Sequence, residues 1–114
     1  MERVRSGEGV SGEPVDGATI EQLAAGERMS TQTYAIEPGV TVPEHSHENE
    51  QVGVVIQGTL VLETDEKRLT FGPGDSYAIP GGEPHVAHNP GETTVRGVEL
   101  FSPPRTGRFW EDDG

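Results

Sequence analysis

Glycine and proline interrupt this chain at short intervals. The 114 residues include 16 glycines and 9 prolines, spread through the sequence rather than clustered. Gly-Pro-Gly-Asp at residues 72–75, Gly-Gly at 81–82 and Asn-Pro-Gly at 89–91 are strong turn signals. No segment between such signals reads as a convincing long helix. The chain must therefore be built from short extended segments joined by turns.

The segments between the turns have the composition of β-strands. Residues 51–57 form the most apolar run and predict a central strand. Residues 18–24 could form a short strand or one helical turn. Further strands are predicted at residues 29–36, 40–47, 59–64, 68–71, 76–80, 84–89 and 93–101. Eight or nine short strands in one small domain are typical of an all-β antiparallel sandwich or jelly-roll barrel.

The two ends of the chain differ from its middle. Residues 1–14 predict a loose N-terminal arm, with strand exchange to a partner as the alternative. Residues 15–101 predict the barrel, as one domain with one core. Residues 102–114 are too rich in proline, glycine and charge for a core and predict a C-terminal arm. That arm carries Phe109 and Trp110, which we expect to be buried against the barrel or a second subunit.

The formal net charge is −12, and Lys67 is the only lysine. Such a surface repels phosphate backbones, so nucleic acid is not an expected partner. The same balance resembles proteins of salt-accumulating cytoplasms, although an ordinary acidic protein has it too. The absence of cysteine excludes disulfides, thiolate ligands and a cysteine nucleophile. No run is long and apolar enough for a membrane helix or signal peptide, so we expect no membrane partner and a cytoplasmic location.

Three histidines point to a metal. His45 and His47 are one residue apart in a predicted strand, where alternation places both on one face. Imidazoles that converge in this way form part of a metal site if further ligands join them, and His85 is the third candidate. Any one of them alone would be read as a polar residue on a half-exposed sheet. His88 has odd spacing from His85 and is expected on the other face, in a surface or structural role.

The spacing of these histidines resembles that of the cupin family. The first cupin motif corresponds to Gly39, His45, His47, Gln51 and Gly58, and the second to Gly74, Pro80, Gly82, His85 and Asn89. Both motifs occur in order, as in small single-domain cupins. The resemblance implies a double-stranded β-helix with one divalent transition metal at the mouth of the barrel. It also implies four ligands, His45, His47, Gln51 and His85.

Gln51 stands where the family most often has glutamate. A first shell of three neutral imidazoles and an amide oxygen suits Ni, Zn, Fe, Mn or Co. Such a shell leaves the ion its full +2 charge, which favours Lewis-acid work on a bound oxygen over redox chemistry. An iron dioxygenase is weakened by this glutamine but remains a third hypothesis.

The last predicted strand carries a second resemblance. Residues 98–105, Val-Glu-Leu-Phe-Ser-Pro-Pro-Arg, resemble the Asp-x-Phe-Ser-Pro-x-x-Arg stretch of cupins that open the ring of unsaturated uronates. The resemblance implies that Glu99 is the acid/base group, that Arg105 binds the substrate carboxylate and that Phe101 forms an apolar wall. Glu99 replaces aspartate, and its extra methylene moves the carboxylate by about 1.5 Å. The alternative is that Glu99 and Arg105 form a surface ion pair that anchors the C-terminal arm.

Two classes of function follow. The first is a metal-dependent lyase or isomerase acting on a small carboxylated sugar or organic acid. The second is a non-catalytic, metal-dependent binding or sensor module for a small molecule. Glu99 and Arg105 distinguish them, because binding alone would not need a proton-transfer group near the metal. An exposed sheet edge and the aromatic arm predict a homodimer.

Overall fold

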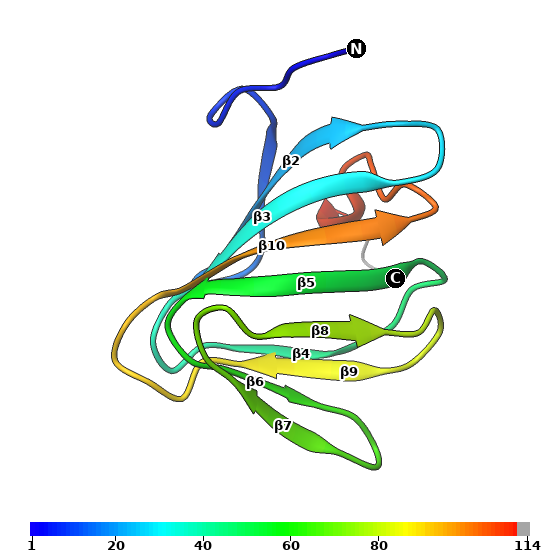
Figure 1. Cartoon of the computed structure of the whole chain (residues 1–114). Helices are drawn as coiled ribbons and strands as arrows, with labels where there is room; N and C mark the ends of the chain where they lie inside the picture. Colours follow the sequence, from blue (N-terminus) through cyan, green and yellow to red (C-terminus); the bar gives the residue numbers. More distant parts are fainter. Residues whose placement is uncertain (112–114) are drawn as a thin grey trace.

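The computed structural model describes residues 1–111 and is almost entirely β-structure (Figure 1). Its elements are β1 (Val10–Val15), β2 (Ala18–Ala25), β3 (Ser30–Ile36), β4 (Thr41–His45), β5 (Glu50–Gln57), β6 (Leu60–Glu63), β7 (Arg68–Phe71), β8 (Ser76–Ile79), β9 (His85–His88), β10 (Val95–Ser102) and the 3₁₀ turn η1 (Phe109–Glu111). Within these residues, no helix has the length and apolar character needed to cross a membrane.

The strands form two antiparallel sheets (Figure 1). The six-stranded sheet has the order β1-β2-β3-β10-β5-β8, and the four-stranded sheet has the order β4-β9-β6-β7. Strands distant in sequence, such as β3 and β10, are therefore neighbours, and from β3 onward the chain passes repeatedly from one sheet to the other. The predicted all-β jelly-roll barrel is confirmed.

The core lies between the two sheets. Alternation along β3 shows how the sequence builds it: Ser30, Gln32, Tyr34 and Ile36 are buried, and the residues between them are partly exposed. The central cluster consists of Ala18, Tyr34, Ile36, Val55, Leu60, Tyr77, Ile79 and Val95. Polar residues also occupy inward positions, and these surround the site described below.

Gly58 permits the tight turn that connects β5 to β6. Gly58 has a φ of +86°, a conformation that side chains other than glycine rarely adopt. A Cβ there would also lie 3.0 Å from the backbone oxygen of Thr94. The turn expected at this position is therefore present, and it places β6 in the opposite sheet from β5.

The N-terminal arm differs from the expectation in its second half. Val10–Val15 forms strand β1, which pairs with β2 in the same chain, for example Val10 with Gln22. The register shifts between Gly12 and Val15, so the strand is irregular. Glycine and proline weaken the strand pattern of β1 in the sequence, whereas the neighbouring β2 supplies the hydrogen bonds that order it.

The histidine strand is shorter than predicted. It ends at His45, and His47 lies in the connection between β4 and β5. Strand alternation therefore does not explain why the two side chains face the same region. The connection is held instead by a hydrogen bond from the Gly82 N–H to the His47 carbonyl, at 2.7 Å.

The C-terminal segment packs against its own barrel. The Asn49 side chain donates to the Pro103 carbonyl, and the Gln22 side chain donates to the Gly107 carbonyl at 2.9 Å. The Arg105 N–H donates to the Ser30 hydroxyl at 2.9 Å. Trp110 lies against Gly12 of β1, where a Cβ would overlap its ring. The last three residues of the predicted arm, 112–114, lie outside the described residues.

Candidate metal centre

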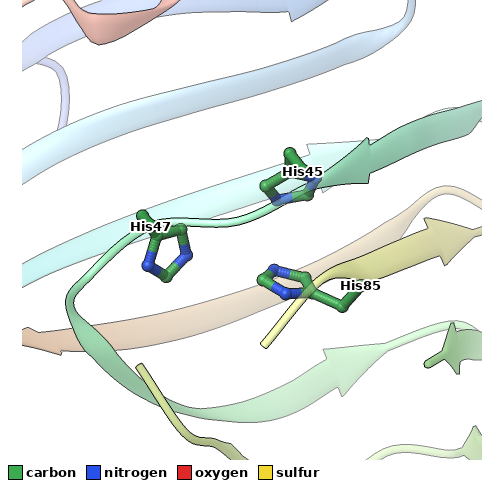
Figure 2. A group of neighbouring side chains, drawn as sticks. All are labelled: His45, His47 and His85. Carbon is green, nitrogen blue, oxygen red and sulfur yellow. The ribbon is translucent and has the colours of Figure 1, made fainter. Parts of the chain in front are cut away.

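The three predicted histidines meet at one end of the barrel (Figure 2). His45 ends β4 and is the cross-strand partner of His85, which begins β9. His47 approaches them from the β4–β5 connection. The ring centroids of His45 and His85 are 4.3 Å apart, and those of His47 and His85 are 5.4 Å apart. One ring nitrogen of each histidine lies within 4.8 Å of those of the other two.

The backbone fixes the tautomer of all three imidazoles. Each Nδ1 lies at hydrogen-bond distance from a carbonyl oxygen two residues away; these oxygens belong to Pro43, Asn49 and Glu83, at 2.9, 3.0 and 2.8 Å. A carbonyl can only accept, so each Nδ1 carries the proton and each Nε2 presents a lone pair. Metal-binding histidines are usually oriented by such bonds.

The Nε2 of His85 is the strongest single indication that the cluster can bind a cation. It is buried and has no hydrogen-bond partner within residues 1–111. A buried polar atom without a partner is costly, whereas a lone pair directed at a metal ion is satisfied. The donor set also suits a divalent transition metal. The three histidines could therefore bind a metal.

Gln51 is oriented as a fourth member of the group. It is buried, and its amide nitrogen donates to the Glu99 carboxylate at 2.8 Å. Because a carboxylate accepts, the amide oxygen faces the other way and lies 3.0 Å from Nε2 of His47. Two acceptors then face each other, an arrangement that a shared cation stabilises. The predicted ligands His45, His47, Gln51 and His85 are thus adjacent.

Burial keeps His45 and His47 neutral. Loss of solvent lowers the pKa of His45 from 6.5 to about 4, and the nearby charges of His85, Arg105 and His47 act in the same direction. The pKa of His47 is lowered too, mainly by burial and then by Arg105. Neutral imidazole is the form that binds metal, so these residues are ready to act as ligands at neutral pH.

Glu99 is held by three donors. Tyr77 and Gln51 donate to its Oε1, both at 2.8 Å, and Gln32 donates to its Oε2 at 3.0 Å. It lies deep in the barrel, with part of its surface facing the cavity. Burial raises its pKa, and the three hydrogen bonds and the Arg105 charge oppose that shift. Glu99 is thus a carboxyl group with a raised pKa, connected to the metal cluster through Gln51.

Sequence reasoning missed Gln32 and Tyr77. Gln32 is the direct cross-strand partner of Glu99, and Tyr77 reaches it from β8 across β5. The tyrosine hydroxyl also lies 3.3 Å from that of Tyr34, which extends the network inward. The available signal was the run of polar residues at inward-facing strand positions, which becomes informative once the strand order is known.

Arg105 covers the cavity without pairing to Glu99. Its guanidinium carbon lies 3.6 Å from the ring centroid of Phe109 and 5.5 Å from that of Phe101. Within residues 1–111, its side chain forms no ion pair or hydrogen bond, and the two residues do not form the surface ion pair considered as the alternative. Burial lowers the pKa of Arg105, and the Glu99 charge opposes this. The arm is anchored by backbone groups instead.

One cavity of about 270 Å³ connects these groups. Its lining includes His45, Gln51, His85, Glu99, Phe101 and Arg105. Phe101 is buried, and its ring centroid lies 5.4 Å from that of His47. His88 is not a member of the histidine cluster, and its Nδ1 lies 2.7 Å from the Thr41 hydroxyl.

Comparison with known proteins agrees with this geometry. A family model described as "Cupin domain" matches residues 32–101, more than half of the chain. The chain belongs to the cupin family. The jelly-roll barrel and the two histidine motifs noted in the sequence are therefore features of a cupin domain.

The chain is also similar to parts of individual proteins. Mannose-1-phosphate guanylyltransferase from Escherichia coli is 30% identical over 82% of this chain, which spans 19% of that protein. The HTH-type transcriptional regulator PuuR from the same organism is 33% identical over 66% of this chain, which spans 40% of it. The structure of KdgF from a Halomonas species superposes with a TM-score of 0.81 at 24% identity, over 92% of this chain and 96% of that one. The KdgF likeness supports the fold.

Proposed function

We propose that this cupin is a metal-dependent lyase or isomerase that moves a proton on a small carboxylate-bearing substrate. The observation that carries the proposal is the position of Glu99. Its buried carboxyl group is hydrogen-bonded to Gln51, which touches the histidine cluster, and it lines the same cavity as Arg105. Pure binding of a metal complex would not require a carboxyl group with a raised pKa there.

His45, His47, Gln51 and His85 are the proposed ligands of one divalent ion, Ni, Zn, Fe, Mn or Co. The bound ion would supply Lewis acidity toward a substrate hydroxyl or carbonyl oxygen. The protein contributes the neutral donor set and its orientation, because the carbonyls of Pro43, Asn49 and Glu83 hold the three Nδ1 atoms.

Glu99 is the proposed acid/base group. A general base works best when its pKa approaches the working pH, and burial moves the pKa of Glu99 upward in that direction. Tyr77 and Gln51 donate to its Oε1, while Oε2 accepts one bond, from Gln32, among the described residues 1–111. We therefore assign the proton transfer to Oε2, which keeps one acceptor position open.

Arg105 is the proposed partner of the substrate carboxylate. Its guanidinium lies over the aromatic rings at the cavity and has no side-chain partner within residues 1–111, so its donors are available. A guanidinium binds a carboxylate through two parallel hydrogen bonds, which also fixes the orientation of the substrate. The resemblance of residues 98–105 to uronate ring-opening cupins makes 4,5-unsaturated monouronates the first substrates to assay.

A second candidate function is a metal-dependent sensor module. The observation that favours it is the match to the regulator PuuR. In that case the same cavity would bind a small molecule without turnover. This alternative predicts saturable binding and an unchanged ligand, whichever carboxylate is offered.

The deciding experiment replaces Glu99 with glutamine. The amide oxygen of the new side chain can still accept from Tyr77 and Gln51, and Gln32 can rotate so that its unpartnered Oε1 accepts from the new amide. We expect the E99Q variant to retain its metal by elemental analysis and to lose at least about 100-fold in kcat. E92Q, on an exposed loop, should retain full activity.

Turnover by E99Q at the wild-type rate would overturn the acid/base assignment. A metal-loaded wild-type protein that binds carboxylates but leaves them unchanged would favour the sensor function. Oxygen uptake with bound iron would favour the dioxygenase instead.

A further inference from the structure

Two chemically different groups of residues line the cavity next to the metal centre. The polar group includes Gln51, His85, Glu99 and Arg105. The aliphatic group, called the apolar side below, comes from both sheets and consists of Ile20, Ile36, Val42, Leu60, Leu62 and Ala87. The aromatic side chains of Phe109 and Trp110 also line it.

The apolar side offers few interior partners for hydroxyl groups. Apart from the side chains at the metal centre, two of the polar lining residues with free ends, Thr19 and Glu44, are exposed at the surface. The third is Gln32, whose buried Oε1 has no hydrogen-bond partner within residues 1–111. The Tyr34 hydroxyl is already engaged with Tyr77. A polyhydroxylated ligand would bury most of its hydroxyls without hydrogen bonds, which is costly, whereas an apolar ligand would gain from the same surface.

We propose that the substrate has an apolar body of about one ring joined through a short chain to a carboxylate. This inference rests on the proposed function and names its substrate class. The carboxylate pairs with Arg105, and the ring lies against the aliphatic side of the cavity. A sugar acid, which the resemblance of residues 98–105 implies, fits this surface less well.

The size of the cavity agrees with a single ring. A cavity of about 150 Å³ lined by aliphatic and aromatic residues holds one benzene molecule. The cavity here is about 270 Å³, which leaves room for a ring and a chain of a few atoms. The Phe101 and Phe109 rings under the guanidinium exclude water from the carboxylate pair, which strengthens it.

The test compares two carboxylates of similar size on the metal-loaded full chain. The probes are 3-phenylpropionate, which has an apolar body, and D-glucuronate, which has a hydroxylated one. Trp110 is the only tryptophan and lines the cavity, so its fluorescence reports binding, and calorimetry gives the dissociation constant independently. We expect 3-phenylpropionate to bind at least about tenfold more tightly.

A matched pair of variants shows where the ring binds. V42N places an amide in the apolar side of the cavity, whereas V52N makes the same change at an exposed position outside it. V42N should weaken 3-phenylpropionate about tenfold, and V52N should not. A87L fills the cavity with an apolar group and should also weaken the binding of 3-phenylpropionate. This second variant keeps the test informative if V42N does not fold. Metal content should remain unchanged in all three.

Tighter binding of glucuronate would overturn the proposal that the substrate has an apolar body, but it would not contradict the proposed function. Equal binding of 3-phenylpropionate to V42N, A87L and the parent protein would also overturn it, because the ring would then bind elsewhere. Failure of both carboxylates to bind the metal-loaded protein would overturn the proposed function as well.

Discussion

Removal of a single imidazole should abolish tight metal binding while a fourth histidine serves as the control. In the H47A variant, one of three converging nitrogens is lost and Gln51 loses the neighbour with which it would share the ion. We expect the metal retained after dialysis to fall at least about tenfold. H88A should retain it, because His88 lies outside the cluster and contacts Thr41. A folded H47A protein with unchanged metal content would contradict the site.

Burial of His45 has a consequence for the pH dependence of the metal-free protein. Its pKa is lowered to about 4, so the folded chain takes up this proton only near pH 4, whereas the unfolded chain takes it up near 6.5. His45 therefore lowers the free energy of unfolding as the pH falls from about 6.5 to about 4. Histidine NMR titration should give the low midpoint and a proton on Nδ1. A midpoint near 6.5 would contradict the burial argument.

The histidines and Gln51 were predictable because their spacing is local. Each lies within one of two short motifs, and the resemblance of these motifs to those of cupins implies which residues meet. Gln32 and Tyr77 were not predictable, because they reach Glu99 through strand neighbours that are far apart in sequence. The face of His47 was inferred from strand alternation, which does not apply beyond the end of β4. The side chains of His45 and His47 do converge, but strand alternation is not the cause.

Gly53 leaves room for the Tyr77 hydroxyl at a point where three strands lie side by side. Gly53 of β5 pairs with both Glu99 of β10 and Tyr77 of β8, and a Cβ at Gly53 would overlap the tyrosine hydroxyl. G53A should therefore displace Tyr77 from Glu99 and lower the free energy of unfolding by about 1–3 kcal/mol. Urea denaturation measures the change.

G26A provides the comparison for this strand-level prediction. Gly26 lies between β2 and β3, and a Cβ there would meet nothing closer than the Met29 carbonyl at 3.9 Å. We expect the stability of G26A to stay within about 0.5 kcal/mol of the parent. Equal stability of G53A and the parent would show that the tyrosine does not need the space.

Most strands could be predicted because turn residues bound them. The segments from β2 to β10 follow the glycine and proline signals, and their bounds lie close to those expected. Strand β1 could not be found in this way, because Gly12 and Pro14 weaken its pattern. Its order depends on β2 and on Trp110, which lies at the opposite end of the chain. Local composition carries no information about such a partner.

Segments near the two ends of the chain come together and complete the cavity. Strand β1 and turn η1 contact each other, and Pro14, Val15, Phe109 and Trp110 all line the cavity. Arg105 lines the same cavity, and its guanidinium lies over the Phe109 ring. The segment expected to be a loose arm and the arm expected to pack on the barrel or a partner therefore both supply part of the cavity lining, and the barrel and its connections supply the histidine cluster.

The contact between the two ends can be broken by one methyl group. In G12A, the new Cβ would overlap the Trp110 ring, so the indole should leave β1 and become exposed. We expect a red-shifted emission, stronger acrylamide quenching and weaker binding of carboxylates, because Phe109 and Arg105 lose their support. The metal content should not change, because no ligand lies on either segment. G72A, where a Cβ would lie 3.8 Å from Asp75, should match the parent. Unchanged emission and quenching in folded G12A would show that Trp110 does not pack there.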